Sequence, residues 1–496
     1  MKKFVLPYLE WEVLHKPITI PKVNDIKELP EGQKRIKIDR DERYKLRGIL
    51  IFEGDYKLLL KELHRLNVAP AGSFVKTFEI QGSNQSGFKC YTLESCSISG
   101  GKISYKEDSQ ETSCEANLNL YGVKIKSKSR VEGTRLTQWC LNGPRDNIFY
   151  RVTDRKVLSS FFRERFASKE DKINSIKISR EDALMVGADF LRIKACDFQF
   201  LVTKVPNGIG PSWSSNIGIE YRKAWGRIPD VREREKIEEI CSFIFGRQLL
   251  PVGYTEYDKN GNMVEVYAHD PWWRDPRSLC SYHDRPPIKI KVHERGRVEN
   301  VISQLLPKYY EKVEHFNFKD AFIFYWISRN MPEGTKLPIL ASAVETVING
   351  WLESKDSKSH GRYMKEKEFH ELMEPEIKTI KSKLERKLNK HHNSEKPSDE
   401  IIKKILNAHQ FGTMEKFRHF FKEITLPVPD YEWKAIKKRH VFAHGGIEFD
   451  KVEWEEVIQL TQTYETLFHK IVLKLLGYSE TYIDYSSVGW KDKQLG

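Results

Sequence analysis

Residues 429–446 read PDYEWKAIKKRHVFAHGG, and this stretch decides how the second half of the chain is expected to fold. Asp430 is a residue type that caps helix N-termini, and Gly445–Gly446 favour the left-handed turn that ends a helix. The stretch therefore predicts a helix over residues 431–444, with His444 in its last turn. At that end the helix dipole favours a protonated imidazole by roughly 0.3–1 kcal/mol.

A permanent cation lies five positions before this histidine. Arg439 offers a forked guanidinium suited to phosphate oxygens, and His444 can gain and lose a proton near neutral pH. RNA transesterification needs these groups, because the 2′-hydroxyl loses a proton, the 5′-oxygen gains one and charge develops on the phosphate. The same two residues could also be ordinary end-of-helix cations that neutralise the dipole. Positions i and i+5 lie about 140° apart on a helix, so both reach one substrate only in a wide cleft or beside a second copy of the chain.

Three segments of the chain match a pattern of Arg and His with four to six residues between them, namely 277–283, 386–391 and 439–444. The first lies in a proline-rich stretch without a helix to fix its geometry, and the second lies in a highly charged stretch without apolar residues to bury one side and shape a pocket. Only the third has apolar residues, Val441–Ala443, that can anchor the turn in a core. We therefore take Arg439 and His444 as the candidate pair, with His440 as a polar neighbour that could assist.

Beyond residue 298 nearly every segment shows the 3.6-residue spacing of apolar side chains that is typical of amphipathic helices. A lysine-rich run, 378–404, is interpreted as the solvated surface of such helices rather than as a binding site. The expected helices cover residues 301–310, 318–328, 337–354, 366–390, 399–407, 414–422, 431–444 and 451–476.

One carboxylate interrupts the apolar helix expected at 337–354. Glu345 stands there among Leu, Ile, Ala and Val. A carboxylate in such surroundings needs a partner, and Arg439 or His444 is a natural one. Glu345 is therefore a fourth candidate site residue.

The first half of the chain is rich in β-branched and aromatic runs that Gly, Asn and Ser interrupt. Helices are expected only at 56–66 and 232–245. Tyr254–Tyr267 is expected to form a hairpin that turns at Asp258–Gly261. The expected strands cover residues 47–52, 75–81, 88–93, 116–125 and 288–292.

These patterns predict a two-part α+β protein, with a β-rich N-terminal region followed by an all-helical bundle. We expect a β-rich sensing or regulatory domain over residues 1–290, a helical domain over 298–480 and a C-terminal tail over 481–496. The 496 residues are too many for a single core.

Composition limits the class of protein. With 83 Lys and Arg against 70 Asp and Glu, the net charge is +13 and favours a polyanionic partner such as RNA. The seven cysteines have no C-x-x-C spacing, which favours reduced thiols in a cytoplasmic protein. The N-terminus lacks the apolar run of a signal peptide, and no segment has the length and apolarity of a membrane span. We therefore expect a cytoplasmic protein without membrane contact.

A second group of polar residues lies in the connector, where His269, Asp270, Asp275, His283 and Asp284 fall within sixteen positions. Metal ligands of this kind are usually fixed on helices, and the prolines of this segment prevent a helix. We therefore interpret the polar residues as turn caps and expect no metal. The neighbouring Trp272 and Trp273 are expected to cover the domain junction, with RNA contact as the alternative. No G-x-x-x-x-G-K-[ST] loop is present, and no cofactor is expected.

The segment RHVFAHGG (439–446), in an expected all-helical domain and followed by a long amphipathic helix, resembles the signature of the HEPN (higher eukaryotes and prokaryotes nucleotide-binding) superfamily. This resemblance implies a metal-independent endoribonuclease that acts as a homodimer through the HEPN domain. It implies that Arg439 and His444 are catalytic, with His440 and Glu345 beside them. Members often have Asn where His440 stands, which leaves the role of His440 open.

The N-terminal succession RGILIF (47–52), FEIQG (78–82) and GFKCYTLESC (87–96) resembles that of ApeA-type bacterial anti-phage proteins. That resemblance implies an abortive-infection effector that cuts RNA, with tRNA as a candidate substrate, when its N-terminal domain senses a phage-derived trigger. The alternative from another class is a non-catalytic HEPN-like module that binds a nucleotide or a partner, in which Arg439 and His444 only hold ligand or helix ends.

Overall fold

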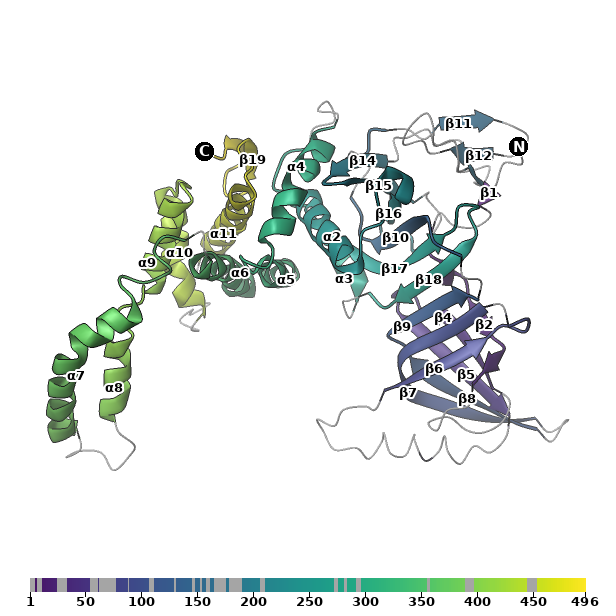
Figure 1. Ribbon diagram of the computed structural model, residues 1–496, viewed down its shortest axis with the longest axis horizontal. Helices are drawn as coiled ribbons and strands as arrows, with labels where there is room; N and C mark the ends of the chain where they lie inside the picture. The colour runs from purple at the N-terminus through teal and green to yellow at the C-terminus, as the bar shows by residue number, and fades with distance from the viewer. Residues whose placement is uncertain are drawn as a thin grey trace. The chain divides into compact units, whose positions relative to one another are not determined.

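The chain divides into two compact units in the computed structural model, one of residues 1–286 with 290–307 and one of residues 287–289 with 308–496. Figure 1 shows the helices and strands of the two units. The structure describes residues 5–6, 11–24, 34–53, 61, 77–87, 89–106, 111–128, 131–144, 148–151, 154–157, 161–164, 175–177, 190–205, 210–271, 275–280, 283–290, 296–354, 357–388, 397–443 and 453–496.

The first unit is built on antiparallel strands, and the second on helices, so the protein is of the mixed α+β class in two parts, as the sequence predicts. The strands of the first unit are β1 (Val5–Leu6), β2 (Ile18–Ile20), β3 (Lys22–Val23), β4 (Lys34–Arg40), β5 (Leu46–Glu53), β6 (Phe78–Ser83), β7 (Lys89–Lys106), β8 (Glu111–Asn119), β9 (Gly122–Ser127), β10 (Arg135–Leu141), β11 (Asp154–Val157), β12 (Phe161–Glu164), β13 (Ser175–Lys177), β14 (Phe190–Ala195), β15 (Phe198–Lys204), β16 (Ile217–Arg222), β17 (Leu250–Tyr257) and β18 (Met263–His269).

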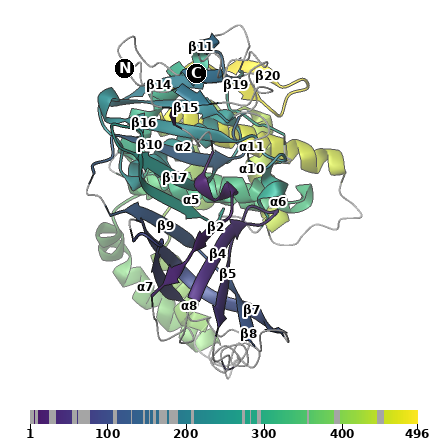
Figure 2. The ribbon, with the colours of Figure 1, turned by 90° about the vertical axis from the view of Figure 1, so that its right-hand side faces the viewer.

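One large sheet runs through this unit in the order β14-β15-β16-β10-β17-β18-β9-β7-β8-β5-β4-β2 (Figure 2). Its centre is β7, whose first half pairs with β6 and β9 and whose second half pairs with β8. The pairing of β7 with β8 shifts register between Ile98 and Gly100, close to the point where β7 stops pairing with β6 and begins to pair with β8. Such bulges bend a strand, which lets one long strand serve two parts of a sheet.

Clusters of buried apolar side chains hold the sheet. Alternating side chains of β4, including Ile36 and Ile38, are fully buried with Leu50 and Leu93 of neighbouring strands. Burying each such side chain contributes roughly 1.5–3 kcal/mol. A second cluster gathers the aromatic rings of Trp11, Tyr44 and Trp139.

Helix α2 (Val231–Phe245) packs on this sheet. Asp230 and Glu233 form a capping box at its start, and Gly246 ends it with φ of 67°. Glu238 accepts a hydrogen bond from Gln138 of β10, and the Arg234 guanidinium lies 4.9 Å from the Tyr254 ring centroid of β17. Both the helix at 232–245 and the hairpin with its Asp258–Gly261 turn are confirmed.

The remaining elements are helices and one hairpin. The described residues contain no helix that combines the length and the apolar character needed to cross a bilayer. The elements are α3 (Pro276–Cys280), α4 (Arg297–Lys312), α5 (Phe318–Arg329), α6 (Glu333–Glu353), α7 (Glu366–Leu388), α8 (Pro397–Leu406), α9 (Thr413–Glu423), α10 (Asp430–Ala443), α11 (Trp454–Leu475), β19 (Thr481–Asp484) and β20 (Lys491–Gln494), with short 3-10 turns at Val13–His15 and Lys223–Trp225.

Helix α6 lies at the centre of the second unit, where it contacts α5, α9, α10 and α11. Its buried residues include Val344 and Val347, and α11 contributes Leu467 and Phe468. The Phe468 ring stacks 4.8 Å from that of Tyr325 on α5. This packing fixes α10 between α6 and α11, and α10 carries the candidate site.

Several expectations differ from the structure. The run 116–125 was expected to be one strand, but β8 ends at Asn119 and β9 begins at Gly122, because the chain turns at Leu120–Tyr121. The strand expected at 288–292 is wrong for residues 288–290, which are irregular. Pro286 and Pro287 precede them, and proline has no N–H to donate to a strand partner. The helix expected at 56–66 lies outside the described residues, apart from Lys61.

The last sixteen residues form a hairpin rather than a free tail. β19 and β20 pair antiparallel, and β19 contacts α11. Tyr482 and Tyr485 are buried, and Asp484 is fully buried with an ion pair to Lys493. Residues 481–496 therefore belong to the helical unit.

Candidate functional site

Arg439 lies on α10 with its side chain almost completely buried, only 2% of the residue being exposed. Its Nε donates to Oε1 of Glu345 on α6 over 2.6 Å. The structure therefore joins Arg439 to the carboxylate that the sequence suggested as a partner for Arg439 or His444. Charge-assisted hydrogen bonds of this kind are roughly twice as strong as neutral ones. The Glu345 side chain is 36% exposed, so the pair is open to solvent on the side of the carboxylate.

The rest of the guanidinium contacts α9 and its own helix. Nη1 donates to the carbonyl oxygen of Ile436 and lies 3.8 Å from Sδ of Met414. The cation also sits 4.9 Å from the ring centroid of Phe417, within the range of a cation–π interaction. Three helices, α6, α9 and α10, therefore fix the orientation of this one side chain.

One donor of Arg439 is left over. Nη2 is buried and has no hydrogen-bond partner among the residues that the structure describes. Buried polar groups are almost always paired, and leaving one unpaired costs roughly 1–3 kcal/mol. Two nitrogens of the guanidinium are thus paired, Nε with Glu345 and Nη1 with the carbonyl oxygen of Ile436, while Nη2 is buried without a described partner.

Tyr464 of α11 adds a second polar group to the same site. Its ring is fully buried, and its hydroxyl also lacks a partner within the described part of the chain. Burial raises the pKa of Tyr464 well above its usual value, Arg439 lowers the pKa and Glu345 raises it. The hydroxyl therefore remains protonated at physiological pH and is available as a donor.

The two histidines of the segment are placed differently. His440 belongs to α10, which includes Ala443 as its last residue, but only its backbone is described. His444 lies outside the described residues. The structure thus brings Arg439 and Glu345 together, and the positions of the two imidazole rings remain predictions.

Sequence reasoning missed the ion pair at the other end of α10. Glu432 is fully buried, and both of its carboxylate oxygens accept from Nζ of Lys470 on α11, over 2.7 and 2.8 Å. Lys470 also donates to the carbonyl oxygen of Pro427 over 3.2 Å. The available signal was Lys470 itself, a single charge in the apolar run 467–473 of a long helix.

This second pair is buried, with the charges of Asp484 and Lys493 also acting on Glu432. Burial raises the pKa of Glu432 above its usual value, and the charge of Lys470 opposes that shift. Breaking such a pair from one side leaves the other charge buried and unpaired. Helix α10 is therefore tied down twice, through Glu432 to α11 near its start and through Arg439 to α6 near its end.

The connector does not form a metal centre among the residues described there. No group of three or more His, Cys, Asp or Glu side chains that could hold a metal is found in the described parts of the chain. Trp272 and Trp273 lie outside the described residues. The polar residues are instead used locally: His269 Nδ1 lies 2.8 Å from the Asp270 carbonyl oxygen, Asp275 pairs with Arg277 at 3.0 Å, and Asp284 pairs with Arg247 at 2.9 Å.

Comparisons with known proteins add no relative to this description. No family model, no curated protein and no solved structure matches the chain. A function for the helical unit therefore has to be inferred from its own side chains.

Proposed function

We propose that the helical unit is a metal-independent endoribonuclease with Arg439 and His444 at its catalytic centre. One observation carries the proposal. The Arg439 guanidinium is fixed by Glu345 and Phe417 while its Nη2 donor has no partner among the described residues. A preorganised cation with a free donor is what a phosphate oxygen requires, because it costs no reorganisation when charge develops during the reaction.

The reaction assigned to this site is transesterification within the RNA chain. The 2′-oxygen attacks the adjacent phosphorus and its proton is removed, while the bond from phosphorus to the 5′-oxygen breaks and that oxygen takes up a proton. The products are a 2′,3′-cyclic phosphate and a 5′-hydroxyl end. His444 moves the protons, with His440 as a possible second group, and Arg439 stabilises the charge on the phosphate.

Glu345 acts in this proposal as a positioning residue rather than a reacting one. Its carboxylate accepts from Nε of Arg439, and Nη2 on the same edge of the guanidinium has no partner among the described residues. Tyr464 contributes a protonated hydroxyl from α11, where the charges of both Arg439 and Glu345 act on it. These two residues supply the orientation and the polar lining of the site.

A second candidate function is a non-catalytic module that binds a nucleotide or a partner protein. The observation that favours it is the burial of Arg439, which is only 2% exposed and pairs with Glu345 between two packed helices. In this reading Arg439 ties α10 to α6 and touches no substrate. The two candidates differ in what a lysine at position 439 does, because lysine keeps the charge but loses the forked donors.

On the wider scale we propose an abortive-infection role, in which the N-terminal unit senses a phage-derived trigger and the helical unit of a homodimer cuts RNA. tRNA is a suitable substrate class, because its loops expose unstacked bases and flexible phosphates. The net charge of +13 is consistent with such a polyanion. A cytoplasmic site of action follows from this role.

Expression of the full chain tests the proposal first. We expect wild-type protein to arrest growth and to fragment total tRNA in EDTA, and Arg439→Lys to lower cleavage at least about tenfold while the fold is retained. The melting temperature of each protein is the control for folding. Intact RNA together with normal growth of cells that express the wild type would favour the binding module. Full cleavage by the lysine variant would instead remove the forked guanidinium of Arg439 from the catalytic mechanism.

A further inference from the structure

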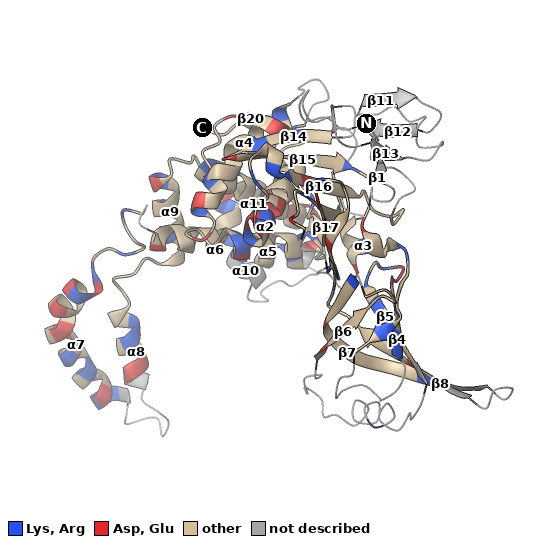
Figure 3. Ribbon diagram, turned by 45° about the vertical axis from the view of Figure 1, so that its right-hand side comes forward, with Lys and Arg blue, Asp and Glu red and all other residues tan. Residues whose placement is uncertain are grey.

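Helices α7 and α8 form an antiparallel hairpin that extends from the rest of the helical unit (Figure 1). Large apolar side chains remain exposed on both helices, with Leu372 at 64% and Ile401 at 37%. Two helices alone cannot cover each other's apolar faces, so such hairpins usually complete a bundle with further helices. Among the described elements of the helical unit, α8 is the helix that packs along α7 (Figure 3).

One row of side chains on α7, apolar after its first member His370, follows the spacing of a coiled coil. His370, Met373, Ile377, Ile380 and Leu384 alternate in steps of three and four, which is the heptad pattern. All five are only partly buried, although α8 already lies against the helix. The described part of α8 therefore leaves this row of five side chains partly uncovered.

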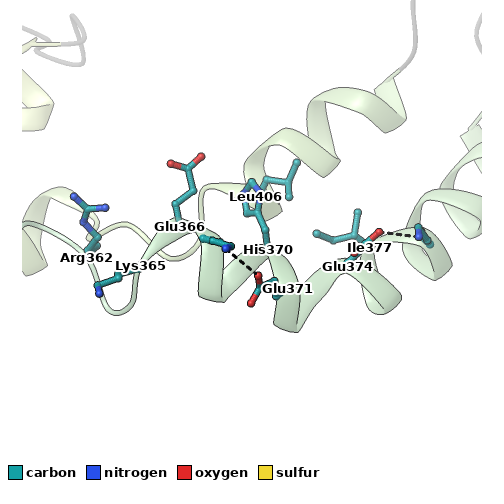
Figure 4. A pocket seen from close by; sticks show the side chains of 10 residues that line it. Arg362, Lys365, Glu366, His370, Glu371, Glu374, Ile377 and Leu406 are labelled. Carbon is teal, nitrogen blue, oxygen red and sulfur yellow. Dashed lines mark hydrogen bonds and ion pairs between the residues drawn. The ribbon is translucent and has the colours of Figure 1, made fainter.

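An open groove lies along the first part of α7 and reaches α8 at Leu406 (Figure 4). Most of its lining side chains are charged, Glu374 and Lys378 among them, and Ile377 and Leu406 are its apolar members. Glu374 and Lys378 form an ion pair of 2.8 Å along the helix. A groove lined by both charged and apolar side chains suits another amphipathic helix.

The charges of α7 divide into two halves of opposite sign at Ile377 (Figure 3). The first half has five glutamates and one lysine, a net charge of −4, and the second half has four lysines, one arginine and one glutamate, a net charge of +4. The helix dipole favours acidic side chains in the first turn and basic side chains in the last turn only. It therefore does not explain a division of charge that covers the whole helix. The charged residues are Glu366, Lys367, Glu368, Glu371, Glu374 and Glu376, then Lys378, Lys381, Lys383, Glu385, Arg386 and Lys387.

We propose that a second copy of this chain occupies the groove, with the two α7 helices antiparallel. That arrangement places each acidic half of α7 against a basic half, and the two hairpins together complete a four-helix bundle. RNA is the less suitable occupant, because the acidic half would repel its phosphates. The inference gives the proposed homodimer a surface, and it does not depend on RNA cleavage.

Charge reversal in the full chain tests this pairing. The first variant replaces the exposed Lys383, Arg386 and Lys387 with Glu, and the second replaces the exposed Glu368, Glu371 and Glu376 with Lys. Sedimentation at micromolar concentration is expected to show a wild-type dimer and, for each variant alone, a dimer dissociation constant raised at least about tenfold. An equimolar mixture of the two variants should form a heterodimer, and the six-fold variant should dimerise again.

Unchanged circular dichroism and melting temperature serve as the control that both variants fold. A monomeric wild type would overturn the inference, as would variants that remain dimeric or a mixture that remains monomeric. Loss of RNA binding in the first variant without any change in dimerisation would assign the basic half to RNA instead. The dimer should also weaken as salt is raised, since exposed charges are screened within about 10 Å at 0.1 M.

Discussion

His444→Ala is expected to lower the rate of RNA cleavage roughly 10²–10⁴-fold, which is the contribution of a positioned acid or base to such a reaction. The reason is that alanine can neither take the proton from the 2′-hydroxyl nor deliver one to the 5′-oxygen. The measurement is the rate of cleavage of a labelled RNA at saturating protein, in EDTA, for wild type and variant.

His391→Ala is the matched control for this prediction. It removes the histidine of a second Arg-x4-His segment, 386–391, which lies in a highly charged stretch of the chain. Its cleavage rate should equal that of the wild type. Equal rates for wild type and His444→Ala, with both proteins folded, would remove His444 from the mechanism.

Lys470→Met is expected to lower the free energy of unfolding by about 3–5 kcal/mol, because it leaves Glu432 buried without its counter-ion. Glu432 is fully buried, and Lys470 is 3% exposed. The double variant Glu432→Gln/Lys470→Met should recover most of the loss, since neither charge then remains in the core. Urea unfolding of both variants and of the wild type gives the three free energies.

The pH dependence of Lys470→Met provides a second check on the same pair. Burial raises the folded-state pKa of Glu432, so the folded protein binds a proton that the unfolded chain binds only at lower pH. The cost of the charged carboxylate is therefore present above the folded pKa and is relieved as the pH falls through it. The variant should regain stability relative to wild type as the pH falls from neutral toward the usual carboxylate pKa of 4.5. A deficit that stayed constant or grew over this range would contradict the assignment.

Much of the secondary structure could be predicted because its signals are local. Asp230 and Glu233 are residue types that indicate the start of α2, and the Asp258–Gly261 turn indicates the hairpin of β17 and β18. The turn at Leu120–Tyr121 was missed because neither residue type marks a turn, so β8 and β9 looked like one strand. The hairpin of residues 481–496 was missed because it is held by packing on α11, for example by the Tyr485 N–H that donates to Thr466, and no local pattern reports such a contact.

The candidate site was only partly predictable, because some of its residues have a local sequence signal and others are brought together only by the packing of helices. Glu345 stood out as a carboxylate in an apolar helix, and burial requires such a group to have a partner. The identity of other contacts depends on how helices pack: Phe417 and Tyr464 reach Arg439 from α9 and α11. The Glu432–Lys470 pair joins residues 38 positions apart, and no local pattern specifies it.

The central claim is that a fixed guanidinium and a titratable imidazole act on one RNA phosphate. Its most direct test is to digest a defined RNA and the same sequence with 2′-deoxy sugars, in EDTA, and to identify the ends of the fragments. We expect the RNA to yield 2′,3′-cyclic phosphate and 5′-hydroxyl ends while the 2′-deoxy strand stays intact. Cleavage of the 2′-deoxy strand, 5′-phosphate ends or no cleavage of either strand would contradict it.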